Sequence, residues 1–151
     1  MSEMHFRPAH AADIDLLLDL MQQFYAIDQY AFDKLSARQA LRTLIEDASL
    51  GRLWIISQRE VVGYVAITFG YSLEFHGRTA TIDELFLLAN YRYQGIGAET
   101  LRFVFAQCRQ LGIRSLHLEV EFSNAAGQAL YRKMGFESYN QRYLMTRWIE
   151  P

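Results

Sequence analysis

One stretch of the chain constrains the fold more than any other, because a strand, a helix and a second strand follow each other there. Residues 79–87 are predicted to form a long strand, residues 95–110 a helix that Gly112 stops, and residues 115–121 alternate between apolar and polar side chains. Two strands of one sheet joined through a helix run parallel in a right-handed crossover. The sequence therefore predicts a central parallel strand-helix-strand unit.

The strands outside this crossover favour antiparallel pairing. The polar turn Gln58–Glu60 separates two strand-like runs and is typical of a hairpin. The fold class that follows is α/β, with a mixed and largely antiparallel sheet and flanking helices. The predicted strands outside the crossover are residues 5–7, 53–56 and 61–69, and two strands within 136–148 that turn at Asn140-Gln141.

Two helices are expected before the hairpin. Apolar residues recur at helical spacing over residues 13–30, with Asp13 as the N-cap. The second helix is predicted to begin at Ser36, because Ser36–Gln39 matches a capping box, and to end before Gly51. Both helices are expected to cover the sheet. Whether the loop at residues 28–33 also borders a substrate pocket is left open by the pattern.

Length and charge exclude several classes of protein. A chain of 151 residues without repeats or linkers predicts a single domain, residues 1–151. Its net charge of −2 offers no positive field for nucleic acid, and no apolar run approaches the ~18 residues of a membrane span. Cys108 is the single cysteine and is expected to pack in the core. With no signal peptide in view, we expect a cytoplasmic protein, and the four histidines lack the spacing of metal ligands.

The loop between the strand at 79–87 and its helix has the features of an anion site. Gly95 and Gly97 allow the backbone to turn tightly and a ligand to approach the amides. Those amides open a helix, where free N–H groups favour an anion, and Arg92 adds a positive charge. A dinucleotide loop needs a third glycine where Thr100 stands, and the Gly-Lys-Ser/Thr ending of a P-loop is missing. Two interpretations remain: the loop binds a pyrophosphate through backbone amides and an arginine, or it is simply a tight turn between strand and helix.

A second segment, Asn124 to Phe136, predicts an amphipathic helix that Gly135 ends. Asn124 and Tyr131 lie seven positions apart, so they fall on one line of the helix. That line would face the carboxyl end of the preceding strand, where open α/β sheets bind ligands. Taken alone, the pattern also fits a plain N-cap at Asn124 and a packed aromatic ring at Tyr131.

Together the two segments resemble the GNAT family of N-acetyltransferases. Arg92-Tyr93-Gln94-Gly95-Ile96-Gly97 is similar to the family's Arg/Gln-x-x-Gly-x-Gly/Ala acyl-CoA loop. Leu130-Tyr131 and Gly135-Phe136 are similar to its second conserved segment, which follows at the expected distance. The resemblance implies a single-domain GNAT-like fold and an enzyme that transfers an acetyl group from acetyl-CoA to an amine by direct attack in a ternary complex.

The resemblance also implies roles for individual residues. Tyr131 matches the family's general acid, which protonates the departing thiolate. Backbone groups at Phe86, Leu87 and Leu88 would bind the pantetheine arm where the strand splays from its neighbour, and Asn124 would orient the pantetheine or a water. The full set of residues expected to bind the cofactor is Phe86, Leu87, Leu88, Arg92, Tyr93, Gln94, Gly95, Ile96, Gly97, Ala98, Asn124 and Tyr131.

The general base is left open between Glu84, Glu119 and a chain of waters. Glu119 stands on the polar face of the strand that leads into the site, where some members of the family carry a proposed base. Glu84 is either an isolated carboxylate in an apolar setting or a pocket residue. Burial without a partner would raise its pKa toward neutrality, as a base requires. Each glutamate also fits a surface or substrate-orienting role.

Carboxylates near the expected acceptor cleft favour a cationic acceptor. The sequence therefore predicts a small amine or a polyamine-like substrate, with a protein lysine or N-terminal amine as the second choice. A non-catalytic regulator that binds acyl-CoA is a further alternative, and both a monomer and a homodimer fit. The residues expected around the cleft are Asp83, Glu84, Glu119, Glu74 and Glu121, with the aromatic rings of Tyr30, Phe32, Tyr71 and Phe75.

Overall fold

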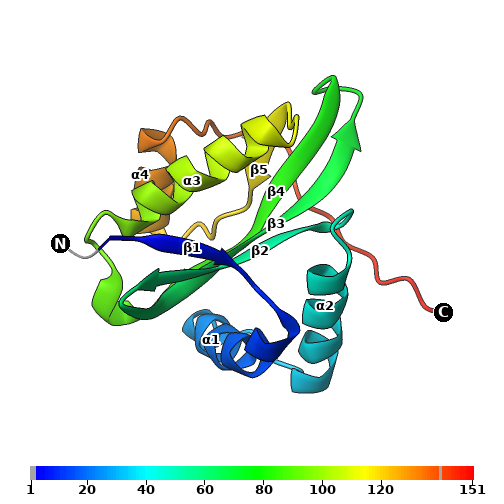
Figure 1. The fold of residues 1–151 in the computed structure, drawn as a ribbon. Helices are drawn as coiled ribbons and strands as arrows, with labels where there is room; N and C mark the ends of the chain where they lie inside the picture. Colours follow the sequence, from blue (N-terminus) through cyan, green and yellow to red (C-terminus); the bar gives the residue numbers. More distant parts are fainter. Residues whose placement is uncertain (1–2, 140) are drawn as a thin grey trace. The chain divides into compact units, whose positions relative to one another are not determined.

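The computed structural model describes residues 3–139 and 141–151, in two compact units, Met1–Glu119 and Val120–Pro151. The first unit contains a five-stranded sheet in the order β1-β2-β3-β4-β5 (Figure 1). Pairing is antiparallel from β1 to β4 and parallel between β4 and β5, which confirms the α/β fold class with a mixed sheet. The strands are β1 (His5–Pro8), β2 (Gly51–Gln58), β3 (Glu60–Ser72), β4 (Gly77–Leu87) and β5 (Ser115–Leu118).

Helices cover both faces of this sheet. The helices α1 (Ile14–Ile27) and α2 (Lys34–Glu46) lie on one face, and α3 (Ile96–Gln110) lies on the other (Figure 1). Short 3-10 turns, η1 (Ala11–Asp13) and η2 (Ala89–Tyr91), precede α1 and α3. No helix within residues 3–139 and 141–151 is long and apolar enough to cross a membrane.

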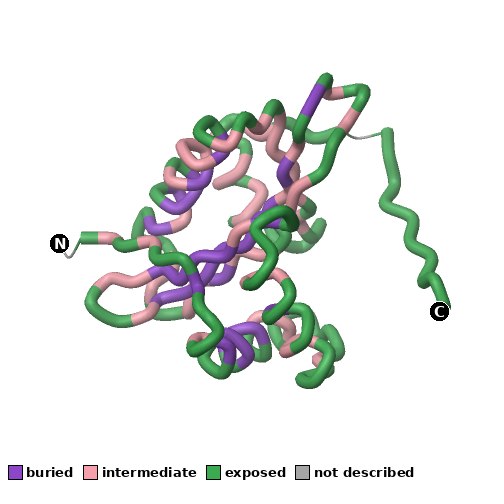
Figure 2. The backbone as a smooth tube through the Cα atoms, turned by 45° about the vertical axis from the view of Figure 1, so that its right-hand side comes forward, coloured by how far each residue is buried: buried purple, intermediate pink, exposed green. Residues whose placement is uncertain are grey.

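Alternating apolar side chains of the strands pack against the helices on both faces of the sheet. On the side of α1, Leu17 and Leu18 pack in one cluster with Ile55, Tyr64 and Phe86 of the sheet. On the side of α3, the Phe103 ring stacks on Phe6 at 4.3 Å and meets Trp54 edge-on at 5.1 Å. Figure 2 shows the buried segments running through the middle of the sheet and along α1 and α3. Cys108 is buried on α3, as expected of a core residue.

The start of α2 differs from the prediction. The helix begins at Lys34, and the side chain of Asp33, not Ser36, caps it by accepting hydrogen bonds from the amides of Leu35 and Ser36. The Ser36 hydroxyl donates to the same carboxylate at 2.6 Å. The carboxylate prevails because one Asp can accept from two free amides and a hydroxyl together, whereas Ser36 offers one oxygen.

The second unit contains the helix α4 (Ala125–Lys133), in agreement with the predicted Asn124–Phe136 segment. The two strands predicted within 136–148 are wrong for the residues that are described there, because 136–139 and 141–148 contain no strand. Asn140, at the predicted turn, lies outside the described residues. Alternating apolar residues favour a strand, but a strand forms only where a neighbour accepts its hydrogen bonds, and the local sequence does not specify that neighbour.

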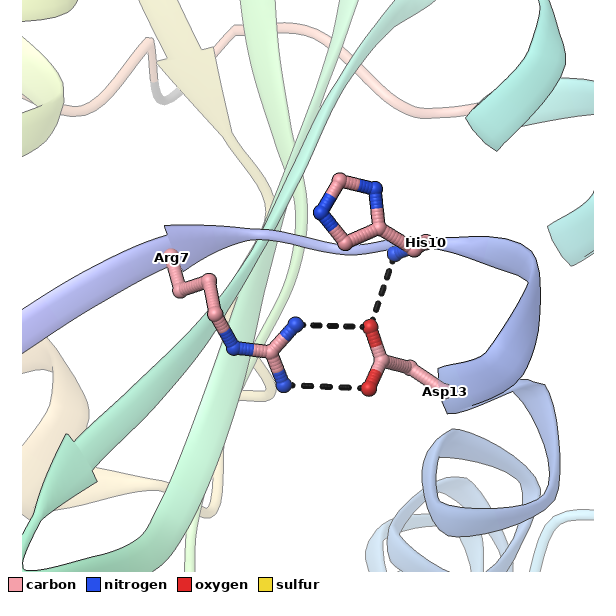
Figure 3. Close-up of polar contacts among 3 residues, drawn as sticks. All are labelled: Arg7, His10 and Asp13. Carbon is pink, nitrogen blue, oxygen red and sulfur yellow. Dashed lines mark hydrogen bonds and ion pairs between the residues drawn. The ribbon is translucent and has the colours of Figure 1, made fainter.

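A carboxylate at Asp13 joins β1 to the start of α1 (Figure 3). It accepts two hydrogen bonds from the Arg7 guanidinium, at 2.8 and 3.0 Å, and a third from the His10 amide at 2.7 Å. The Arg7 hydrogen bond holds the pKa of Asp13 below its usual range. The side chain thus fixes the turn from which the first helix departs, and it does so only while it is ionised.

Replacing Asp13 by Asn should lower the free energy of unfolding by about 1 kcal/mol at neutral pH, because the bidentate ion pair is lost. Since the folded-state pKa of Asp13 is depressed, its contribution is complete above the unfolded pKa and disappears as the pH falls through the folded one. Urea unfolding at neutral and acidic pH measures this. Asp19→Asn, an exposed change on α1, is the control; an equal loss in both variants would contradict the prediction.

Candidate active site

The pairing of β4 changes at Asp83, in the middle of the strand. Against β5, the ladder ends with the pair Ile82 and Leu118. Against β3, the register shifts so that Ala66 lies opposite Glu84 while Ile67 lies opposite Ile82, which makes Asp83 the extra residue of a β-bulge. Bulges commonly end a ladder and redirect side chains. The pairing of β4 with β5 therefore ends before Phe86, Leu87 and Leu88, the residues that the family resemblance assigns to pantetheine.

Glu84 is held between two tyrosine hydroxyls on the face that α1 covers. Tyr64 of β3 donates to one carboxylate oxygen at 2.7 Å, and Tyr25 of α1 donates to the other. Burial raises the pKa of Glu84, the two hydrogen bonds oppose that rise, and the nearby charge of Asp83 adds to it. The pKa stays above its usual value because burial outweighs the two donors. Glu84 is thus a partnered carboxylate, not the isolated one that was considered.

The two tyrosines remain phenols over a wide pH range. Burial and the adjacent Glu84 carboxylate raise the pKa of both Tyr25 and Tyr64 well above the usual phenol value. The Tyr64 side chain is fully buried, and the Tyr25 ring packs edge-on against Phe32 at 5.4 Å. Both therefore act as hydrogen-bond donors that orient Glu84. No polar role for Tyr25 or Tyr64 followed from the sequence.

Phe86, Leu87 and Leu88, which are expected to bind pantetheine, lie at the end of β4. Their backbone groups do not all point to the same edge of the strand. The Leu88 amide donates to Val62 of β3 at 2.8 Å, and a Cβ on Gly63 would lie 1.9 Å from the Phe86 carbonyl oxygen, so both groups point toward β3. Backbone groups alternate along a strand, so Leu87 presents its own groups to the opposite edge. There its carbonyl accepts from Arg92 Nε at 2.9 Å.

Arg92 is anchored at the entry to the loop. Besides its bond to Leu87, its guanidinium lies over the Phe86 ring, 5.6 Å from the ring centroid. One edge of the guanidinium is thereby used to fix its orientation, and a planar fork of donors can still serve a phosphate with its remaining N–H groups. The structure thus keeps Arg92 next to the glycine loop, where the sequence placed it.

The loop itself turns through left-handed backbone at two positions. Tyr93 has φ of 60° with an exposed ring, and Gly95 has φ of 82° and forms the N-cap of α3. The first helical hydrogen bond runs from the Glu99 amide to the Gly95 carbonyl, so helix geometry gives the amides of Ile96, Gly97 and Ala98 no partner inside the helix. Gln94 Nε2 donates to the Asn90 carbonyl and braces the loop. These amides are the ones for which the sequence predicts a bound anion.

In the second unit, Asn124 and Tyr131 take defined local positions. Asn124 caps α4, because its Oδ1 accepts from the Gly127 amide at 2.9 Å. Tyr131 is partly buried, its ring packs edge-on against Phe136 at 5.8 Å, and burial raises the pKa of its phenol. Asn124 therefore has the structural role of an N-cap, and Tyr131 is a protonated phenol.

Glu119 differs from Glu84 in its surroundings. It follows the end of β5 and is exposed, whereas Glu84 is enclosed by the α1 layer. Among the residues that the structure describes, no group of three or more His, Cys, Asp or Glu side chains could hold a metal ion. The structure brings together Glu84 with Tyr25, Tyr64 and Asp83. Glu119 comes directly after Leu118, which pairs with Ile82 at the end of the β4–β5 ladder.

Comparison with known proteins identifies the family of this chain. The acetyltransferase (GNAT) family pattern matches residues 15–136. The chain belongs to this family. This GNAT acetyltransferase is 24% identical over 134 residues to the uncharacterized N-acetyltransferase YhfO of Bacillus subtilis (strain 168), covering 89% of the chain and 90% of YhfO. It is an enzyme that uses acetyl-CoA for N-acetylation, as the family does.

Two solved structures are similar to this GNAT acetyltransferase. The integron cassette protein HFX_CASS3, from the mobile metagenome of Cole Harbour Salt Marsh, has a TM-score of 0.85 and 33% identity, covering 97% of this chain and 91% of that one. A predicted acetyltransferase from Clostridium acetobutylicum, solved with acetyl-CoA, has a TM-score of 0.80 and 18% identity, covering 95% and 96% of the two chains. The second likeness shows the fold.

Removing either hydroxyl that contacts Glu84 should raise the pKa of this carboxyl further, because each hydrogen bond stabilises the ionised form. We expect this shift in Tyr25→Phe and in Tyr64→Phe, measured as the carbon-13 titration of the Glu84 carboxyl by NMR. Tyr64→Phe should also cost about 1 kcal/mol of unfolding free energy.

Tyr71→Phe provides the control, since that side chain is 74% exposed. It should leave the Glu84 titration unchanged. A Glu84 pKa that is the same in all three variants and the wild type would show that the hydroxyls do not act on the carboxylate.

Proposed function

We propose that this acetyltransferase acetylates the primary amine of a small cationic molecule, by direct attack on acetyl-CoA in a ternary complex. The observation that carries the acceptor class is the bulge of β4. Beside it, Glu84 meets Tyr25 of α1 and Asp83 lines a cavity against α2, so both carboxylates lie on the face that these helices cover. Two adjacent carboxylates, at the point where the strand splays, give that face a negative potential that attracts an ammonium group.

The donor site follows from the loop. The amides of Ile96, Gly97 and Ala98, together with Arg92, bind the pyrophosphate of acetyl-CoA. The edge of β4 beyond its pairing with β5 receives the pantetheine amides as an added strand, and the Leu87 carbonyl on this edge also accepts from Arg92. The family match spans residues 15–136 and thus crosses the boundary between the two units, which supports one acetyltransferase domain over the chain.

Proton transfer is assigned to two side chains. An amine is protonated at neutral pH and must lose a proton before it attacks the thioester. Glu84 accepts this proton, directly or through water, since its burial gives it a more basic carboxylate than an exposed one has. Tyr131 donates a proton to the departing thiolate. Because its pKa is raised, the phenol is protonated at neutral pH and has this proton to give.

Glu84→Gln should lower kcat/KM for the amine at least a hundredfold, whereas Glu119→Gln should leave it within a few-fold of wild type. The wild-type rate should fall as the pH drops through the raised pKa of Glu84, because the protonated carboxyl accepts no proton. Thiol release from acetyl-CoA across a pH series measures both effects. A large loss in Glu119→Gln alone would assign the base to Glu119.

Tyr131→Phe should lower kcat by about a hundredfold while the KM for acetyl-CoA stays nearly constant, because only the proton donor is removed. Tyr139→Phe, an exposed tyrosine of the same unit, is the matched control. The measurement is steady-state thiol release with saturating amine. An unchanged kcat in Tyr131→Phe would place the general acid elsewhere.

A further inference from the structure

A cavity of about 660 Å³ lies between α2 and the strands β3 and β4. Its wall on α2 is formed by Ser36, Gln39, Ala40 and Thr43, and Asp83 contributes from β4. Leu44 and Leu50 add apolar surface. Among the described residues that line the cavity, Asp83 is the one charged side chain. The cavity thus combines hydroxyl and amide groups, a short apolar wall and a single negative charge.

The Asp83 carboxylate differs from Glu84 beside it in having no partner. No hydrogen bond or ion pair to it occurs in the part of the chain that the structure describes, whereas both oxygens of Glu84 accept from tyrosines. Packing around Asp83 removes part of its hydration and raises its pKa. Asp83 is exposed at the wall of the cavity, and an unpartnered carboxylate at that place attracts a cationic group that enters the cavity.

We propose that this cavity binds a second cationic group of the acceptor, so that the preferred substrate carries two ammonium groups. The inference rests on the proposed N-acetylation of a small cationic amine and deepens it. Glu84 is occupied by its two tyrosines and takes up the proton of the reacting amine through water, while Asp83 holds the other end of the molecule. The bulge at Asp83 is what allows two consecutive residues of one strand to serve one ligand.

The spacing along β4 sets the length of the ligand. Asp83 and Phe86 are three residues apart, and a strand rises about 3.3 Å per residue, so roughly 10 Å separates the cation site from the expected thioester arm. An extended aliphatic chain of that length connects the two ammonium groups. A diamine such as 1,8-diaminooctane spans this distance, and octylamine is the matched ligand that lacks the second charge.

The experiment compares these two amines in the full-length enzyme. Thiol release with saturating acetyl-CoA gives KM and kcat for each amine, and NMR titration with coenzyme A present gives the dissociation constant independently of turnover. The variants are Asp83→Asn, which removes the charge, and Ala40→Phe, which fills the cavity from the exposed face of α2. Asp19→Asn removes one negative charge outside the cavity and serves as the control.

We expect wild type to bind 1,8-diaminooctane about tenfold more tightly than octylamine, and Asp83→Asn and Ala40→Phe to abolish that difference. The control Asp19→Asn should keep both the difference and the kcat of wild type. If amines are acetylated but Asp83→Asn does not change the preference for the diamine, the cavity is not the site of the second cation, while the proposed function stands. Diamine binding that depends on Asp83 without turnover of any amine would retain the cavity and reject the function. If neither turnover nor Asp83-dependent diamine binding is observed, both the cavity proposal and the proposed function are rejected.

Discussion

The chain must reverse from β4 into α3 within a few residues, and the rest of the site depends on how the backbone achieves this. Tyr93 and Gly95 both adopt positive φ, a region that a side chain makes costly and that glycine adopts freely. A Cβ at Gly95 would meet nothing within 4 Å, so the glycine is there for its backbone angle and not for space. The reversal leaves the first amides of α3 directed at the loop, as an anion site requires.

The same strand carries the two carboxylates that we propose attract the acceptor amine. The bulge at Asp83 ends the pairing with β5 and turns two carboxylates toward the layer formed by α1 and α2. One of them, Glu84, is stabilised by hydroxyls from α1 and β3, so the carboxylate links the helical layer to the sheet. A buried carboxylate without these donors would cost several kcal/mol, which is why the two tyrosines belong to the site and not only to the core.

Local patterns predicted the parts of this site that are close in sequence. The glycine loop after β4, the helix that follows and the parallel partner strand are all encoded within residues 79–118. Asn124 likewise caps its helix through a residue three positions away. The choice between Ser36 and Asp33 as a cap was decided by a local competition that the capping-box pattern did not resolve.

Features that join distant residues could not be predicted. Tyr25 meets Glu84 across 59 positions, and no periodicity reports such a pair. The bulge depends on the register between β3 and β4, which is set by packing and not by composition. Tyr64 lies two positions from Ala66, which pairs with Glu84, so its side chain is on the same face as this carboxylate. That is a weak signal that could have suggested Tyr64 as a partner of Glu84.

Calorimetric titration of coenzyme A tests the central claim, the binding of the cofactor by the loop after β4. The wild type should show saturable heat with one site, and Gly95→Ala should weaken binding about tenfold. Gly112→Ala also introduces a Cβ at a positive φ in open space. It should lower the free energy of unfolding by about 1 kcal/mol, as Gly95→Ala does, but bind coenzyme A as tightly as wild type. No heat with folded wild type, or equal affinity in Gly95→Ala, would contradict the account.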